Sequence, residues 1–269
     1  MSISAGGLGA PTGDSAAGNG IVIAVDGPSA SGKSSASRGA ARALGLRYLD
    51  TGSMYRALTW WILARGVPVD DAQAVAEAAG EPIIDVGTDP DGPWVTVDGQ
   101  DVSAAIRTQP VTSAVSAVAR VPRVRAQLIA QQREIIAQAR AEGRGIVAEG
   151  RDIGTVVAPD AVVKVYLTAS EHARAQRRSA ETPSDPAVAA GAGQDWAGQD
   201  GASQDRASQV RVTQADQARR DRMDSGQLAR ADDAVEIDST MFGLGDVTAM
   251  IIGLAQERAG LPDTARTTR

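Results

Sequence analysis

The sequence predicts an α/β fold in which a five-stranded parallel sheet carries helices on both faces. Five short apolar runs, each typical of a strand buried on both faces, alternate with stretches of helical character. These runs cover residues 21–25, 48–49, 145–148, 162–167 and 234–237. Aromatic residues make up only 3% of the chain, so Val, Ile, Leu and Ala must build the core. That composition suits buried parallel strands.

The segments between these runs support the same fold. Residues 21–25 lead into a Gly/Ser loop and then into an Ala-rich stretch, 33–44, which predicts a strand, a loop and a helix. Pro122 stands at a favourable first position for a long helix over 122–141. Residues 83–102 break the rhythm with Pro, Gly and Asp clusters, and Asp98-Gly99 is a strong hairpin signal. We therefore expect a small antiparallel insertion there.

Composition excludes several classes of protein. The 269 residues are 43% hydrophobic, which is enough for a sizeable core and excludes a wholly disordered chain. The absence of cysteine excludes disulfides, zinc thiolate sites and thiol catalysis. The net charge of −6 argues against general nucleic-acid binding, and no apolar run reaches the roughly 18 residues of a membrane span. We expect a cytoplasmic protein with no nucleic-acid or membrane partner, and a monomer.

Three segments lie outside this pattern. Residues 1–19 are rich in Gly, Ala and Ser, with one charged side chain, and predict a disordered N-terminal tail. Residues 182–209 repeat glutamine every five positions, from Gln194 to Gln209, and contain one large apolar residue, Trp196. This low-complexity insertion cannot bury enough surface to offset its ordering entropy. Residues 259–269 are expected to form a C-terminal tail.

The loop after the first strand carries a phosphate-binding motif. Residues 27–34, GPSASGKS, fit the G-x-x-x-x-G-K-[ST] pattern between a buried strand and a helix, as its mechanism requires. In such loops, backbone N–H groups and the helix N-terminus hold phosphate, the lysine reaches the β- and γ-phosphates, and the hydroxyl ligates Mg²⁺. The nucleotide-binding candidates are Gly27, Pro28, Ser29, Ala30, Ser31, Gly32, Lys33, Ser34 and Ser35. Ser34 is the candidate metal ligand.

The same motif occurs in GTPases, which read guanine with an Asn-Lys-x-Asp sequence. The only asparagine of this chain is Asn19, in the expected tail, which disfavours a guanine switch. A kinase needs arginines that converge on its phosphate acceptor, because guanidinium groups hold phosphate in bidentate pairs. Arginines occur in or beside five candidate segments: 50–56, 106–108, 122–125, 150–152 and 219–224. The Arg-Asp pair at 151–152 follows a buried strand, where ligands of parallel sheets bind.

At these residues the chain resembles the bacterial cytidylate kinases of the long-chain type. The matching stretches run in order from about residue 21 to 258: IVIAVDGPSASGKSS, LDTGSMYRAL, DVSAAIRTQPV, SAVARVPRVRAQL, GIVAEGRDIGTVVAPDAVVKVYL, RRDRMDS and ADDAVEIDST. The resemblance implies a P-loop kinase domain over 20–258. It also implies a monophosphate-binding insertion at about 66–115 and a helical lid at about 170–225. The implied reaction transfers a phosphoryl group from ATP, with Mg²⁺, to CMP or dCMP.

The resemblance also implies roles for individual residues. Tyr55, Arg56 and Arg151 match the positions that hold the CMP phosphate, and Ser116, Arg125 and Asp152 match those that read cytosine. A carboxylate suits this reading because it accepts from the 4-amino group of cytosine but faces a carbonyl in uracil. Arg220 and Asp224 match the sugar contacts, while Asp50, Thr51 and Arg107 line the same pocket. The catalytic set implied is Lys33, Arg151, Arg177 and Arg220, and the lid arginines are Arg174, Arg177 and Arg178.

One position departs from the resemblance. Gln227 stands where an arginine is expected, in a loop several residues short, and Arg230 or a lid arginine is the candidate replacement. Two alternatives therefore stay open beside an active cytidylate kinase. One is a catalytically impaired nucleotide-binding relative, and the other is a P-loop kinase for a different small-molecule acceptor.

Overall fold

In the computed structural model, the main sheet contains the five expected parallel strands. The structure describes residues 20–181, 219 and 228–261. The strands are β1 (Val22–Asp26), β2 (Arg47–Asp50), β6 (Ile146–Gly150), β7 (Val163–Thr168) and β8 (Val235–Asp238). Their order across the sheet is β2-β6-β1-β7-β8, and all neighbouring pairs are parallel. The α/β prediction is confirmed.

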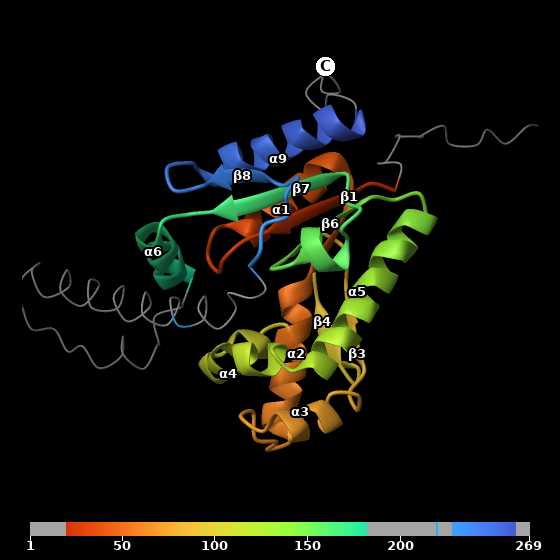
Figure 1. Cartoon of the computed structure of the whole chain (residues 1–269), viewed down its shortest axis with the longest axis vertical. Helices are drawn as coiled ribbons and strands as arrows, with labels where there is room; N and C mark the ends of the chain where they lie inside the picture. The colour runs from red at the N-terminus through yellow and green to blue at the C-terminus, as the bar shows by residue number, and fades with distance from the viewer. Residues whose placement is uncertain (1–19, 182–218, 220–227, 262–269) are drawn as a thin grey trace, which may run out of the picture.

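The central strand β1 is buried on both faces. Ile23 and Val25 pack with α1 (Lys33–Leu44) and α9 (Leu244–Ala259), which together cover one face. Val22 and Ala24 face the other cluster, to which α2 (Thr51–Ala64) and α5 (Pro122–Ala141) contribute. Figure 1 shows α9 on one side of the sheet, with α2 and α5 extending from the other. This two-sided burial explains why the strand reads as an unbroken apolar run.

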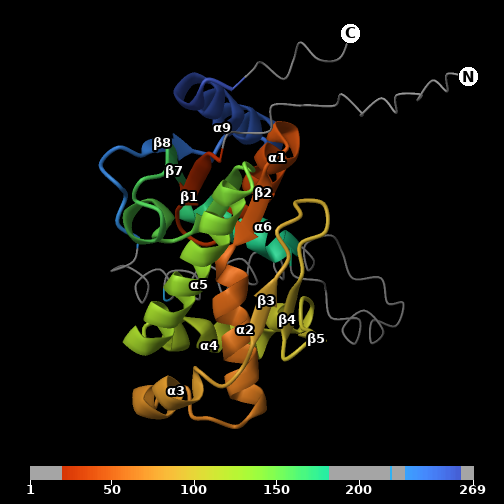
Figure 2. The ribbon, with the colours of Figure 1, turned by 90° about the vertical axis from the view of Figure 1, so that its right-hand side faces the viewer.

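The expected antiparallel insertion is a three-stranded sheet in the order β3-β4-β5. It comprises β3 (Ile84–Val86), β4 (Val95–Val97) and β5 (Gln100–Asp101). Asp98 and Gly99 form the predicted turn with positive φ angles of 50° and 79°. Figure 2 shows this small sheet on one side of α2, with α5 on the other. The remaining elements of this region are α3 (Ala72–Ala78), the short η1 (Ala105–Arg107) and α4 (Gln109–Ala119).

Two further elements follow main-sheet strands. The five-residue turn η2 (Ile153–Val157) follows β6 with two residues between them, and α6 (Glu171–Glu181) follows β7. None of the helices within the described ranges combines the length and the apolar character needed to cross a bilayer. The expected tail 1–19, the Gln-rich insertion 182–209 and most of the expected lid and C-terminal tail lie outside the described residues.

Candidate active site

The phosphate loop joins β1 to the N-terminus of α1. Gly27 leaves β1 with φ +143°, and a Cβ there would lie 2.1 Å from the carbonyl oxygen of Leu167 in β7. Gly32, with φ +93°, is the N-cap of α1, so the first turn of the helix presents its free N–H groups toward the loop. The backbone therefore forms the anion-binding cradle that the motif predicts.

Lys33 points into this cradle. Its Nζ donates a hydrogen bond of 2.8 Å to the carbonyl oxygen of Pro28, and its side chain is buried. Burial, and after it the positive charge of Arg151, lowers the pKa of Lys33 to about 8. A phosphate placed here would offset both effects and favour the charged ammonium group.

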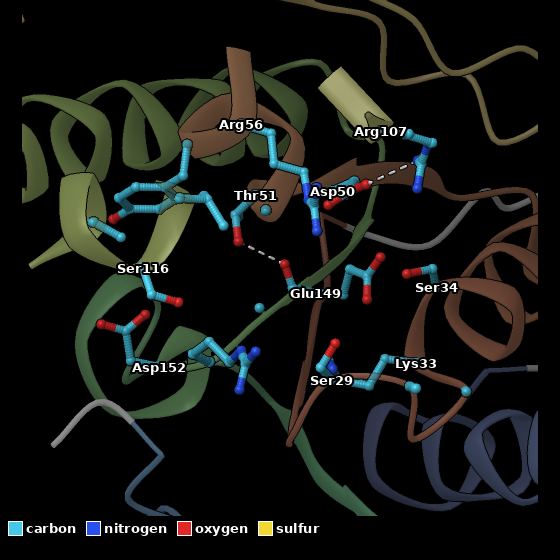
Figure 3. A pocket seen from close by; sticks show the side chains of 18 of the residues that line it. Ser29, Lys33, Ser34, Asp50, Thr51, Arg56, Arg107, Ser116, Glu149 and Asp152 are labelled. Carbon is cyan, nitrogen blue, oxygen red and sulfur yellow. Dashed lines mark hydrogen bonds and ion pairs between the residues drawn. The ribbon is translucent and has the colours of Figure 1, made fainter. Parts of the chain in front are cut away.

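A cavity of about 480 Å³ opens in front of the loop at the carboxyl ends of β2 and β6. Figure 3 shows Ser116 and Asp152 at one end of it and Lys33 and Ser34 at the other. The predicted site residues that line it are Ser29, Ala30, Gly32, Lys33, Ser34, Ser35, Thr51, Tyr55, Arg56, Arg107, Ser116, Arg125, Arg151 and Asp152. The structure thus brings together residues from six separate segments of the chain.

Several predicted site residues lie elsewhere. Gly27, Pro28 and Ser31 shape the phosphate loop but do not line the cavity. Arg220 and Asp224 fall outside the described residues, as does Gln227.

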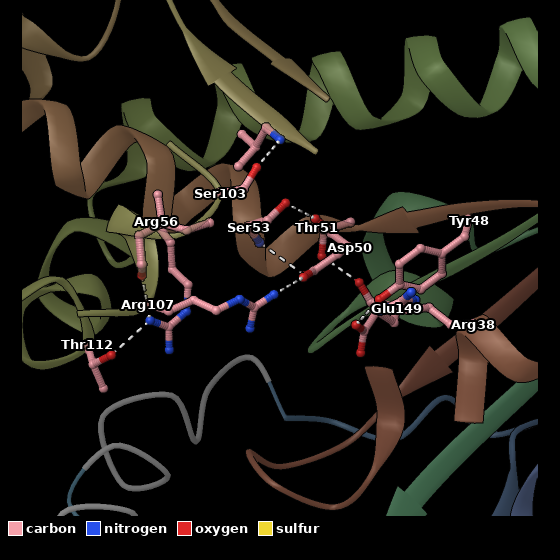
Figure 4. A network of polar contacts seen from close by, with 12 residues as sticks. Arg38, Tyr48, Asp50, Thr51, Ser53, Arg56, Ser103, Arg107, Thr112 and Glu149 are labelled. Carbon is pink, nitrogen blue, oxygen red and sulfur yellow. Dashed lines mark hydrogen bonds and ion pairs between the residues drawn. The ribbon is translucent and has the colours of Figure 1, made fainter. Parts of the chain in front are cut away.

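Two of the arginines that line the cavity, Arg56 and Arg107, also contact other residues. Arg56, on α2, donates through Nη1 to the carbonyl oxygen of Ile106 (3.1 Å) and to Oγ1 of Thr112 (2.9 Å), as Figure 4 shows. Arg107 lies 3.8 Å from the carboxylate of Asp50. These contacts hold the guanidinium group of Arg56 and bring that of Arg107 near Asp50, while both side chains border the cavity. The arrangement suits a phosphate, which Arg binds through several donors at once.

At the end of the cavity opposite Lys33, Arg125 and Asp152 form an ion pair. Arg125 comes from the first turns of α5, and Asp152 lies between β6 and η2. Ser116, on α4, borders the same space. This end therefore presents a carboxylate acceptor beside guanidinium and hydroxyl donors, which matches the hydrogen-bonding edge of an aminopyrimidine ring.

A buried carboxylate lies in the middle of the cavity wall. Glu149 accepts a 2.6 Å hydrogen bond from the hydroxyl of Tyr48, and its backbone oxygen accepts from Oγ1 of Thr51 at 2.7 Å. Burial, and next the negative charge of Asp50, raises the pKa of Glu149 to about 7. The same burial, with the charge of Glu149, raises the pKa of Tyr48.

These oxygen donors bear on metal binding. Ser34, Asp50 and Glu149 border one side of the cavity, and hydroxyl and carboxylate oxygens are the ligands that Mg²⁺ prefers. No group of three His, Asp, Glu or Cys side chains close enough to form a metal cage occurs in the described part of the chain. Mg²⁺ is commonly held by one or two carboxylates together with substrate phosphates. The donor set therefore fits a metal that arrives with a nucleotide.

Comparison with known proteins agrees with this geometry. The family model for cytidylate kinase matches residues 23–257. The chain is 46% identical over 240 residues to the cytidylate kinase of Streptomyces griseus, covering 88% of this chain and 93% of that protein. It is 46% identical over 245 residues to the Rhodococcus opacus cytidylate kinase and 44% identical over 245 residues to the Mycobacterium leprae protein. These two matches cover 90% and 89% of this chain and 97% of each relative. The chain belongs to the cytidylate kinase family.

In this family member, two of the expected lid arginines contact the phosphate loop. Arg174 donates to the carbonyl oxygen of Ser29 at 3.3 Å. Arg177 donates to the carbonyl oxygen of Ser31 at 3.2 Å, and to the hydroxyl and carbonyl oxygens of Ser239 at 2.8 and 2.6 Å. Both guanidinium groups therefore lie beside the phosphate loop. The side chain of Arg178 is outside the described part.

Arg230 was one candidate for the charge missing at Gln227. In the structure its Nη1 lies 2.5 Å from Oε2 of Glu236 in an exposed ion pair, and it does not line the cavity. Arg174 and Arg177 do not line the cavity either, but both contact the phosphate loop, so among the described residues they are the better placed candidates.

Sequence reasoning missed three residues of this site. Arg38 lines the cavity, and its position one helical turn after Ser34 was the signal that could have found it. Tyr48, which donates to Glu149, was read only as part of a strand. Asp26, which ends β1, accepts hydrogen bonds from two backbone N–H groups of η2, and no local sequence pattern predicts this contact.

Proposed function

We propose that this chain transfers the γ-phosphoryl group of ATP to CMP or dCMP, giving ADP and CDP or dCDP. The observation that carries the proposal is the single cavity that joins a phosphate loop at one end to the Ser116, Arg125 and Asp152 cluster at the other. Membership in the cytidylate kinase family supports the same reaction. Shikimate has no aminopyrimidine edge, so a kinase for that acceptor would not need this cluster.

The proposed mechanism relies on positioning and on charge. ATP lies with its phosphates on the loop 27–34, where Lys33 contacts the β- and γ-phosphates. Arg56, Tyr55 and Arg151 hold the CMP phosphate so that one of its oxygens faces the γ-phosphorus in line with the leaving oxygen. Phosphoryl transfer needs little covalent chemistry from the protein, so holding the two substrates at this spacing lowers most of the barrier.

Charge neutralisation completes the proposed site. Ser34 would hold Mg²⁺, with Glu149 close enough to contact it through water, and the ion supplies positive charge to the phosphate oxygens. Arg177 shifts from the phosphate-loop carbonyl to the transferring group when the lid closes, and closure excludes water. Arg220 and Asp224 are proposed to contact the sugar.

We also propose a domain organisation, an oligomeric state and a location for the protein. A kinase domain extends over 20–258, with a monophosphate-binding region at about 66–115 and a lid at about 170–225. We propose that the protein acts as a monomer in the cytoplasm, where ATP and CMP are available.

The test is ADP release from purified protein with Mg-ATP and, separately, CMP, dCMP, UMP, AMP and shikimate. We expect rapid turnover with CMP and dCMP only. Lys33→Met should lower kcat by at least about 100-fold, because it removes a charge that contacts the transferring group. Arg140→Met removes an exposed cation that is paired with Asp160, remote from the cavity, and should leave kcat unchanged. Tight binding of ATP and CMP without turnover would instead establish the impaired alternative.

A further inference from the structure

Asp26 is a buried carboxylate that none of the roles above uses. It is the last residue of β1 and is 5% exposed. Its Oδ1 accepts a 2.7 Å hydrogen bond from the backbone N–H of Ile153, and its Oδ2 accepts one of 2.7 Å from the N–H of Gly154. These two donors open η2. Both carboxylate oxygens are thus committed to one short turn.

Burying the carboxylate of Asp26 costs free energy, which its contacts must offset. A carboxylate loses its hydration at this depth, and burial is the main reason why the pKa of Asp26 is raised. The two charge-assisted bonds offset part of that loss. The negative charge of Asp152 also raises this pKa, and the positive charge of Lys33 lowers it.

The turn that Asp26 holds follows the acceptor residues directly. Arg151 and Asp152 immediately precede η2, and the carbonyl of Asp152 accepts from the N–H of Val156 at 2.8 Å. Gly154 permits the close approach, because a Cβ there would lie 3.3 Å from Oδ2 of Asp26 and 3.2 Å from Cδ of Lys164. The turn therefore has little freedom to move relative to the end of β1.

Asp26 is also covalently joined to the donor side, because the next residue is Gly27, the first of the phosphate loop. We propose that Asp26 is a positioning residue that fixes Arg151 and Asp152 at a set spacing from the phosphate loop. One side chain thereby connects the site of the phosphoryl donor with that of the acceptor. The proposal rests on the proposed function. A misplacement of about 1 Å between the reacting groups is enough to slow phosphoryl transfer by about 100-fold, so this spacing matters for the rate.

The test is Asp26→Asn, which keeps the shape but replaces one acceptor with an amide that faces an N–H group. We expect KM for CMP to rise at least tenfold and the preference for CMP over UMP to fall, while KM for ATP stays within twofold. Asp71→Asn is the matched control, because Asp71 also accepts from two backbone N–H groups, at the start of α3 and away from the cavity. It should leave both KM values unchanged.

A merely structural role would give a different pattern. The proposal would be overturned if Asp26→Asn changed KM for ATP and KM for CMP equally, or changed neither. It would also be overturned if urea denaturation showed that unfolding of the variant accounts for its whole loss of activity. If Asp26→Asn fails to fold, Gly154→Val places a branched side chain where even a Cβ would lie 3.3 Å from Oδ2 of Asp26, and it should give the same selective rise in KM for CMP. Kinetics of Gly154→Val equal to those of wild type would contradict the proposal.

Two further readouts do not depend on turnover. Calorimetry with CMP alone should show weaker binding by Asp26→Asn than by wild type even if wild type transfers no phosphate, which would defeat only the proposed function. Hydrogen exchange over residues 151–157 should be faster in Asp26→Asn. Exchange equal to that of wild type would refute the positioning role irrespective of any activity.

Discussion

At the scale of single residues, the ion pair between Arg125 and Asp152 is the point where we propose that the cavity distinguishes one base from another. The carboxylate of Asp152 has two oxygens, and Arg125 donates to one of them. The remaining acceptor capacity can receive the 4-amino group of cytosine. Uracil presents a carbonyl there, so the discrimination comes from repulsion as well as from attraction.

Asp152→Asn tests this account of base selection. Loss of a hydrogen bond to a charged group is worth about 1.5–3 kcal/mol, so kcat/KM for CMP should fall by about 10- to 100-fold. The amide can donate to the uracil carbonyl, so the preference for CMP over UMP should narrow. Competition assays with both nucleotides measure the ratio. Asp160→Asn, which removes a carboxylate from an exposed ion pair, is the control and should not alter it. An unchanged ratio in Asp152→Asn would contradict the assignment.

Residue contacts of this kind were predictable only where a motif named the residue. The phosphate loop and four of the arginines that line the cavity were found in this way, whereas Arg38 was not. Tyr48 and Glu149 are 101 positions apart, and Asp26 and Ile153 are 127 apart. Their contacts depend on which strands become neighbours, and strand order cannot be obtained from a local pattern.

At the scale of elements, the phosphate loop packs closely against β7 at Gly27. The carbonyl oxygen of Leu167 occupies the space that a Cβ would need, and backbone cannot rotate away as a side chain can. The positive φ of Gly27 adds a second requirement for glycine. The loop conformation is therefore set by the neighbouring strand as well as by its own sequence.

Gly27→Ala should lower the free energy of unfolding by about 3 kcal/mol, because both the clash and the backbone strain act on it. Urea denaturation followed by tryptophan fluorescence measures this change. Gly80→Ala is the matched control, since no atom lies within 4 Å of a Cβ there, and it should change the stability by less than about 0.5 kcal/mol. Equal stabilities for the two variants would show that the loop adapts freely.

Most elements of the main sheet were predictable, and the reason is burial. Strands covered on both faces are largely apolar, so β1 reads as an apolar run up to Asp26, and β7 is apolar at most positions although it contains Lys164. The turn at Asp98-Gly99 was predictable because it needs positive φ. The π-type turn η2 was not, since Asp26, a distant residue, supplies the partners for its first two N–H groups.

At the scale of the whole molecule, the cavity lies where three parts of the chain meet. The main sheet and phosphate loop supply the donor end, α2, α4 and α5 supply the acceptor end, and α6 brings Arg174 and Arg177 to the loop. Figures 1 and 2 show α2 extending away from the main sheet, with the small antiparallel sheet beside it. Both α2 and α5 therefore connect the acceptor end with the main sheet.

The most direct test is a crystal structure of the protein with CMP and a non-hydrolysable ATP analogue. The account predicts that the CMP phosphate lies within hydrogen-bond distance of Arg56 and Arg151, with its 4-amino group toward Asp152. The γ-phosphate of the analogue should contact Lys33 at the opposite end of the same cavity. CMP bound outside this cavity, or with its base toward the phosphate loop, would contradict the account.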